Sequence, residues 1–271
     1  LPVNASEGPF LTDDEHKQVL KTGKEVVDGA VPIVGGVSGA STAVSVDLTK
    51  NAADLGVNSV IAMPPNGAAG SIIWDHYVAI ATAAQMPVWI QNNKPPAGPV
   101  VPTEMMVQLL REVEYVNYVK EESYLPGQVM TQLFEQAGNS VKGIMGGMGG
   151  RFLTDEYRRG SCGTMPAGHI TDAHVKLWKA LDTGGVDHEG LQVVTDEARG
   201  IWEHMIPSLK MARSVVPPPM SISTTPICFS SPESTASALA RGSSTMLPMV
   251  MPAPSTARTT LSREAASPMI A

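Results

Sequence analysis

Residues 88–123, VWIQNNKPPAGPVVPTEMMVQLLREVEYVNYVKEES, contain the pattern that decides the fold. Residues 88–91 form a short apolar run of the strand type, and an Asn- and Pro-rich turn follows. After Thr103 the apolar residues recur at helical spacing, and residues 116–119 form a second apolar run. A strand, a helical crossover and another strand make a βαβ unit, whose two strands are parallel.

The same alternation of strand and helix extends outward in both directions, about seven times between Leu1 and Met211. Seven consecutive units favour a (β/α)8 TIM barrel over a doubly wound sheet. Leu1 to Val3 resembles the end of a strand. We therefore predict an α/β protein in which residues 1–213 form a TIM barrel that lacks its first strand and N-terminal helix and ends in C-terminal helices. The expected internal strands are 31–34, 59–63, 88–91, 116–119, 141–145 and 162–166.

Two polar stretches predict where helices begin. Thr12 opens the sequence Thr-Asp-Asp-Glu, in which the threonine hydroxyl and the Glu15 carboxylate can form a capping box. Ser41 or Thr42 can cap the next expected helix, which reaches about Leu55.

Composition excludes several classes of protein. A net charge of −7 without a Lys/Arg cluster argues against a nucleic-acid partner. The chain has two distant cysteines, which suggest neither a disulfide framework nor a Cys-based metal site. No apolar run is long enough to cross a membrane, so we expect no membrane partner and a cytoplasmic location.

Composition changes near Ser214. Residues 214–271 are rich in Ser, Pro, Thr and Met and show no strand or helix period, so we expect a disordered tail without a packed core. Either a natural extension or an out-of-frame reading of the gene would give such a tail.

The end of the 116–119 strand carries the strongest candidate for chemistry. Side chains alternate between the two faces of a strand, so Tyr118, Lys120 and Glu122 share one face. If that face lines a barrel, burial disfavours the ammonium form of Lys120, and a neutral amine can form a Schiff base with a carbonyl. The alternative is a strand-end lysine that reaches solvent. Four nearby carboxylates are interpreted as solvated charges, of which Glu122 alone could face the pocket: Glu112, Glu114, Glu121 and Glu122.

Two further features have ordinary interpretations. Residues 146–150, GGMGG, could cradle a phosphate, but a tight loop at the edge of the pocket is the simpler interpretation. The histidines contain no His-x-x-x-His pair, and we interpret His169 and His174 as cap or surface residues. We therefore expect no metal site and no cofactor.

Several motifs together resemble the dihydrodipicolinate synthase/N-acetylneuraminate lyase family of class I aldolases. Residues 116–123, VNYVKEES, are similar to the segment that bears the Schiff-base lysine of this family, which implies that role for Lys120. The resemblance also implies a TIM barrel, a small-molecule 2-oxo acid as substrate and a homotetramer. The other similar segments are Glu7 with 11–16 (LTDDEH), 31–42 (VPIVGGVSGAST), 55–60 (LGVNSV) with Pro64 and Pro65, and 160–164 (GSCGT).

The sequence departs from the family pattern at positions that select the substrate. Gln91, followed by Asn92, takes the place of the tyrosine proton relay, and the threonine pair that holds the substrate carboxylate falls on Asn4 and Ala5. The arginine of the synthases falls on Pro96, and a second tyrosine falls on Asn66. The pattern is more similar to the branch that dehydrates 2-keto-3-deoxy sugar acids such as 2-keto-3-deoxyarabonate.

These residues lead to one expected function and two alternatives. We expect a Schiff-base lyase that dehydrates or cleaves a 2-keto-3-deoxy sugar acid, with Lys120 as the nucleophile. The alternatives are a 4-hydroxy-tetrahydrodipicolinate synthase-type condensation of pyruvate with an aldehyde, and an inactive truncated family member. The residues expected to bind substrate are Asn4, Ser6, Gln91, Asn92 and Thr164.

Overall fold

The protein is described by a computed structural model that covers residues 1–166, 171–185, 196–197 and 199–205. Six parallel strands form one sheet, in sequential order from β1 to β6. The sheet curves into a half-barrel, so the predicted α/β class and TIM-barrel-like architecture are confirmed. The strands are β1 (Val34–Gly36), β2 (Ser59–Ala62), β3 (Val88–Asn92), β4 (Val116–Glu121), β5 (Gly143–Gly146) and β6 (Gly163–Thr164).

The first strand-like segment of the chain lies beside β1. The Leu1 amino group donates to the Val34 carbonyl at 2.5 Å, and the Leu1 carbonyl accepts from the Gly36 N–H at 2.9 Å. A Cβ at Gly36 would lie 1.7 Å from the Pro2 carbonyl oxygen, so the glycine allows this close approach. The strand expected at residues 31–34 is instead formed by Val34–Gly36, and Gly35 and Gly36 pair with β2.

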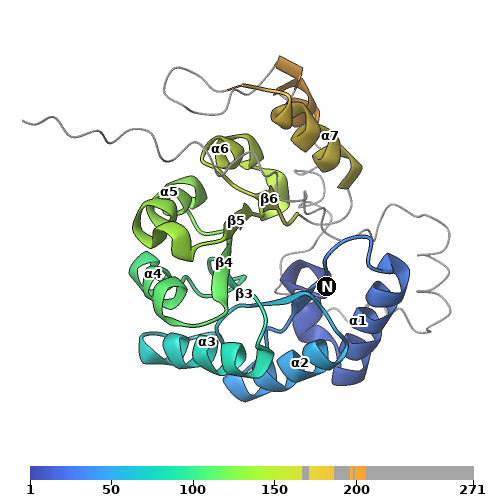
Figure 1. The fold of residues 1–271 in the computed structure, drawn as a ribbon, viewed down its shortest axis with the longest axis vertical. Helices are drawn as coiled ribbons and strands as arrows, with labels where there is room; N and C mark the ends of the chain where they lie inside the picture. The colour runs from blue at the N-terminus through green and yellow to red at the C-terminus, as the bar shows by residue number, and fades with distance from the viewer. Residues whose placement is uncertain (167–170, 186–195, 198, 206–271) are drawn as a thin grey trace, which may run out of the picture.

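Helices follow one another around the outside of the strands (Figure 1). The helices between β1 and β6 each join one strand to the next parallel strand, as the βαβ pattern predicted. The α-helices are α1 (Asp13–Val27), α2 (Thr42–Asp54), α3 (Ser71–Ala84), α4 (Thr103–Glu112), α5 (Pro126–Ala137), α6 (Leu153–Arg158) and α7 (Thr171–Asp182). Short 3-10 turns are η1 (Asn4–Ser6), η2 (Gly8–Phe10), η3 (Gly138–Ser140) and η4 (Met148–Gly150).

Both predicted helix starts are confirmed. The Thr12 hydroxyl accepts from the Glu15 N–H at 3.3 Å, and the Glu15 carboxylate accepts from the Thr12 N–H at 2.9 Å. The Ser41 hydroxyl caps α2 by accepting from the Val44 N–H at 3.3 Å. These caps satisfy amides that have no partner within the helix.

Two apolar layers cover the two faces of the sheet. The larger layer lies between the strands and the helices and includes Val60, Ile90, Val119 and Ile144. The smaller layer lies on the inner face of the half-barrel and consists of Val34, Ile61, Trp89, Met145 and Met165. Side chains from one strand thus alternate between the helices and the barrel interior.

A smaller apolar cluster lies in the C-terminal part of the described chain. Helices α6 and α7 share a separate apolar cluster that contains Leu153, Tyr157 and Leu177. Part of the expected C-terminal helices lies outside the described residues, and the expected disordered tail, 214–271, lies entirely outside them. Among the helices that the structure describes, none is long and apolar enough to span a membrane.

Candidate active site

The Lys120 side chain lies on the inner face of the half-barrel. In the sheet register Lys120 pairs with Gln91 of β3 on one side and with Met145 of β5 on the other. Met145 belongs to the inner apolar layer, and Lys120 is only 3% exposed. The alternative of a strand-end lysine in solvent is therefore wrong, because the strand curvature turns this face inward.

An aromatic pair lies one inward row deeper than the lysine. Trp89 and Tyr118 pair in the register one inward row before Gln91 and Lys120. Their rings stack with centroids 4.4 Å apart and an interplanar angle of 21°, and the Trp89 indole N–H donates to the Ser59 hydroxyl at 3.1 Å. Burial raises the pKa of the Tyr118 phenol.

Glu122 is the closest charged partner of the lysine. Its Oε2 atom lies 3.0 Å from Lys120 Nζ and accepts from the Gln91 amide nitrogen, also at 3.0 Å. Its Oε1 atom accepts from the Met148 N–H at 2.8 Å. The two charged side chains are 4% and 10% exposed, so the ion pair is buried. Burial alone would raise the pKa of Glu122, but Lys120, the Met148 N–H and the Gln91 amide hold it below its ordinary value.

The glycine-rich loop after β5 makes room for this carboxylate. A Cβ at Gly147 would lie 2.1 Å from Glu122 Oε1. The next residue, Met148, supplies the backbone N–H that the carboxylate accepts. Residues 146–150 thus pass close to Glu122 and contribute one of their amides to it.

Glu121 and Asn92 lie on the opposite face of the sheet. The Asn92 amide nitrogen donates to Glu121 Oε2 at 2.7 Å, and its oxygen accepts from the Val101 N–H at 2.8 Å. Glu121 Oε1 accepts from the Ser123 N–H at 2.8 Å. Burial raises the pKa of Glu121, although its hydrogen bonds with Ser123 and Asn92 oppose the shift. The interpretation of Glu121 and Glu122 as solvated charges is wrong, since both are buried.

The remaining expected substrate contacts lie outside the Lys120 strand and its neighbour β3. Asn4 and Ser6 lie in η1, where the Asn4 amide donates to the Ala97 carbonyl of the loop after β3 at 3.2 Å and Ser6 is exposed. Thr164 pairs with Gly146, one residue beyond the row of Lys120 and Met145, so it faces the helix side of the sheet. Within the described residues its buried hydroxyl has no hydrogen-bond partner.

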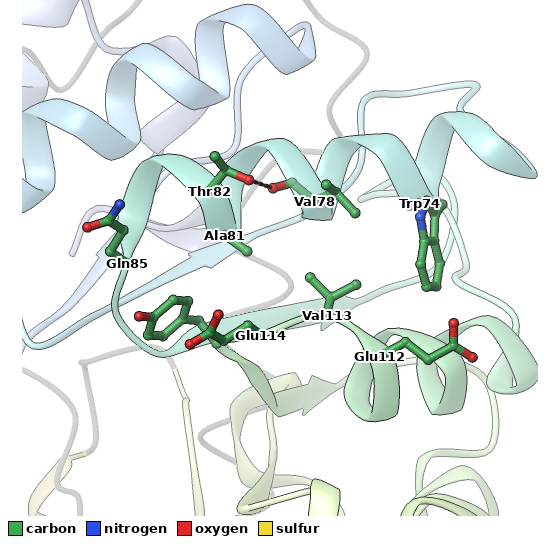
Figure 2. Close-up of a pocket in the computed structure, with 9 residues that line it drawn as sticks. Trp74, Val78, Ala81, Thr82, Gln85, Glu112, Val113 and Glu114 are labelled. Carbon is green, nitrogen blue, oxygen red and sulfur yellow. Dashed lines mark hydrogen bonds between the residues drawn. The ribbon is translucent and has the colours of Figure 1, made fainter.

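A separate hollow of about 530 Å³ opens on the outer surface. Trp74, Val78 and Gln85 line it from α3 and its end, and residues 112–115 line it from the end of α4 (Figure 2). Neither Lys120 nor Glu122 lines this hollow, so it is not the lysine site. Within the described residues, no cluster of three or more His, Cys, Asp or Glu side chains could hold a metal ion.

A comparison with known families identifies the chain. Residues 4–149, more than half of the chain, match the model of the Dihydrodipicolinate synthetase family. The chain belongs to this family. The match covers the strands β1 to β5, including the Lys120 strand, and it confirms the resemblance that the sequence motifs indicated.

Relatives with two different activities are similar to this member of the family. L-2-keto-3-deoxyarabonate dehydratase of Azospirillum brasilense is 29% identical over 68% of this chain and 61% of its own length. The 4-hydroxy-tetrahydrodipicolinate synthase of Lactococcus lactis is 35% identical over 45% of this chain and 41% of its own length. The crystal structure of a dihydrodipicolinate synthase from Bacillus anthracis superposes with a TM-score of 0.69 at 20% identity, over 93% of this chain and 79% of that chain.

The chain spans less than two thirds of the length of these curated relatives. The activity of neither relative is therefore assigned to this chain. Glu122 is the residue whose environment the sequence analysis got wrong: it is a buried partner of Lys120 and not a solvated charge. The alternation of side chains along a strand correctly placed Glu122 on the face of Lys120. The general expectation that a carboxylate stays in solvent was wrong for this residue. Its partners Gln91 and Met148 are 31 and 26 residues away, so only strand pairing shows that they converge.

Proposed function

We propose that this dihydrodipicolinate synthetase family member is a lyase that forms a Schiff base between Lys120 and a 2-oxo acid. The observation that carries the proposal is the buried amine of Lys120 on the interior face of the half-barrel, at the C-terminal end of β4. Reactive groups of TIM barrels lie at this end of the strands. A neutral lysine amine attacks the carbonyl carbon of a 2-oxo acid and forms a Schiff base.

For the substrate we propose a 2-keto-3-deoxy sugar acid, which the enzyme dehydrates or cleaves in an aldol fashion. The support is Gln91, which stands where the family resemblance places the tyrosine relay, and the similarity to the Azospirillum brasilense dehydratase. Pro96 and Asn66 at the positions of a synthase arginine and tyrosine argue against the condensation of the alternative function.

The substrate carboxylate needs hydroxyl or amide donors at the mouth of the pocket. We place it near Ser6 and the N–H groups of η1, because Asn4 ties this turn to the loop after β3. Lys94 lies in the same loop: the Ala97 N–H donates to the Lys94 carbonyl at 3.0 Å, and the Lys94 amine lies 3.8 Å from the Met148 sulfur. A cation in this loop favours an anionic ligand.

Borohydride trapping tests the proposal directly. The protein is incubated with pyruvate and reduced, and we expect an added mass on the peptide that contains Lys120. Lys120→Met should abolish the adduct. Lys142→Met is the matched control, because Lys142 is exposed and its amine bonds only the nearby Asn139 carbonyl among the described residues. No adduct from folded wild-type protein would reject the proposal and favour an inactive family member.

A panel of 2-keto-3-deoxy acids then separates the two reactions. Dehydration gives a product that is lighter by one water, whereas aldol cleavage gives pyruvate and an aldehyde. Formation of pyruvate without the dehydrated product would assign the enzyme to the aldolases.

A further inference from the structure

We propose that Glu122 is the catalytic acid–base residue of this enzyme, in the role that a tyrosine relay would otherwise have. The inference rests on the proposed Schiff-base function. It addresses a gap in that function: a C3 proton must leave the iminium and a C4 hydroxyl must depart as water. Each transfer needs a titratable group within hydrogen-bond reach of the reacting atoms. The Gln91 amide cannot supply one, since it does not titrate.

The position of Glu122 matches the atoms that react. Its Oε2 atom lies 3.0 Å from Lys120 Nζ, the atom that becomes the iminium nitrogen. Substrate C3 is two bonds away from that nitrogen, about 2.5 Å with ordinary bond lengths. A carboxylate oxygen beside the nitrogen therefore lies within reach of a C3 hydrogen without a large movement of either side chain.

Two further donors hold the carboxylate in place. Gln91 donates to the same oxygen that faces the lysine, and the Met148 N–H donates to the other oxygen. Donors from β3 and from the loop after β5 approach the carboxylate from two neighbouring elements, so its orientation is set before the substrate arrives. Such preorganised, charge-assisted hydrogen bonds are short and strong.

Burial provides the driving force for the proton transfer. The iminium cation and the Glu122 carboxylate form an ion pair in a site from which solvent is nearly excluded. Transfer of the C3 proton converts this pair into a neutral enamine and a neutral carboxyl group. A buried site favours neutral groups over charged ones, so the environment that surrounds Glu122 promotes the step.

The other candidates on the same face are less suitable. Tyr118 lies one inward row deeper than Lys120, where its ring stacks on Trp89. Met145, the other neighbour of the lysine in the register, carries no titratable group. Among the described residues that pair with Lys120 in the sheet register or form an ion pair with it, Glu122 alone can exchange protons.

The proposed step balances without an oxidant or reductant. The carboxylate takes the C3 proton, the C–H electron pair forms the C2–C3 double bond, and the iminium electrons return to nitrogen. The nitrogen pair then restores the iminium, the enamine electrons form the C3–C4 double bond, and the C4–O bond breaks. The Glu122 carboxyl returns its proton to that oxygen, which leaves as water.

Pyruvate in D2O separates this inference from the proposed function. Borohydride trapping reports the iminium, and NMR of the C3 hydrogens reports proton removal. In Glu122→Gln we expect trapping to persist while C3 exchange slows roughly 100-fold or more. Glu122→Asp should recover part of the exchange, and Glu114→Gln, which removes an exposed carboxylate, should exchange like wild type.

The outcomes have different meanings. Wild-type exchange in folded Glu122→Gln would overturn the assignment, as would a folded variant that no longer forms the adduct, because Glu122 would then act on the lysine alone. No adduct in the wild type would instead reject the proposed function. If Glu122→Gln is not recovered folded, Gly147→Ala replaces it, since its methyl group would displace the carboxylate without removing it. This variant should also keep trapping and lose exchange; unchanged exchange would contradict the assignment.

Discussion

The Gln91 amide nitrogen and Lys120 Nζ both lie 3.0 Å from the same oxygen of Glu122. Gln91 belongs to β3, Lys120 belongs to β4, and Glu122 directly follows β4. The three side chains thus meet at one carboxylate oxygen. Because the contact is buried, a change in any one of them alters the electrostatic environment of the other two.

Gln91→Leu removes the neutral donor and leaves the ion pair. We expect C3 exchange of pyruvate to fall about 10-fold, because the carboxylate loses one of its fixed partners, while the borohydride adduct still forms. The measurement is the exchange rate at saturating pyruvate.

Gln91→Glu tests the same contact by charge. A second carboxylate beside Glu122 raises the pKa of the pair, so the pH at which exchange reaches half its maximum should move upward. An unchanged pH profile in both Gln91 variants would show that Gln91 does not act on Glu122.

Tyr118→Phe should have little effect on proton transfer. The phenol lies below the lysine, and its pKa is raised by burial, so we expect C3 exchange within about 3-fold of wild type. The ring stack with Trp89 remains in this variant. A loss of exchange comparable with that of Glu122→Gln would transfer the acid–base role to the tyrosine.

Glu156 should make stability depend on pH. Burial, with the charges of Asp155, Glu122 and Glu121, raises the pKa of Glu156 to about 8 from an ordinary 4.5. Its Oε2 atom lacks a hydrogen-bond partner within the described residues, as expected for an acid that remains protonated. The folded state binds the proton more tightly than the unfolded chain. The contribution to stability is therefore complete below about pH 4.5 and is lost as the pH rises through about 8.

Glu156→Gln provides the measurement. The variant should have a higher free energy of unfolding than wild type at pH 9, on the order of 3 kcal/mol, and the difference should shrink toward pH 5. Urea unfolding of both proteins across this range tests the sign. If the free energies of unfolding of the two proteins differ by the same amount at every pH, Glu156 gains no proton on folding.

Ser6→Ala tests the proposed site of the substrate carboxylate. Loss of a hydroxyl donor that binds substrate and transition state equally should raise the half-saturating pyruvate concentration several-fold and leave the saturated exchange rate unchanged. Lys94→Met serves as the comparison. If only Lys94→Met raises the half-saturating pyruvate concentration, the substrate carboxylate lies against the loop after β3 and not against η1.

Part of the candidate site was visible in the chain. The apolar runs and helical spacings predicted the βαβ units, and the period of two placed Tyr118, Lys120 and Glu122 on one face, as the structure confirms. Asn92 and Thr164 were expected to bind the substrate. The register instead places them on the face opposite Gln91 and Met145, since one residue along a strand reverses the direction of the side chain.

The sequence by itself determined the alternation of strands and helices, the capped helix starts and the strand-end position of Lys120. These features depend on residues within a few positions of each other, where backbone geometry and local hydrogen bonds act. Tertiary structure alone decided that Glu122 is buried, that Gln91 and the Met148 amide reach it, and that Gly147 leaves it room. The physical reason is that the cost of burying a carboxylate is offset only by donors that strand pairing brings from distant parts of the chain.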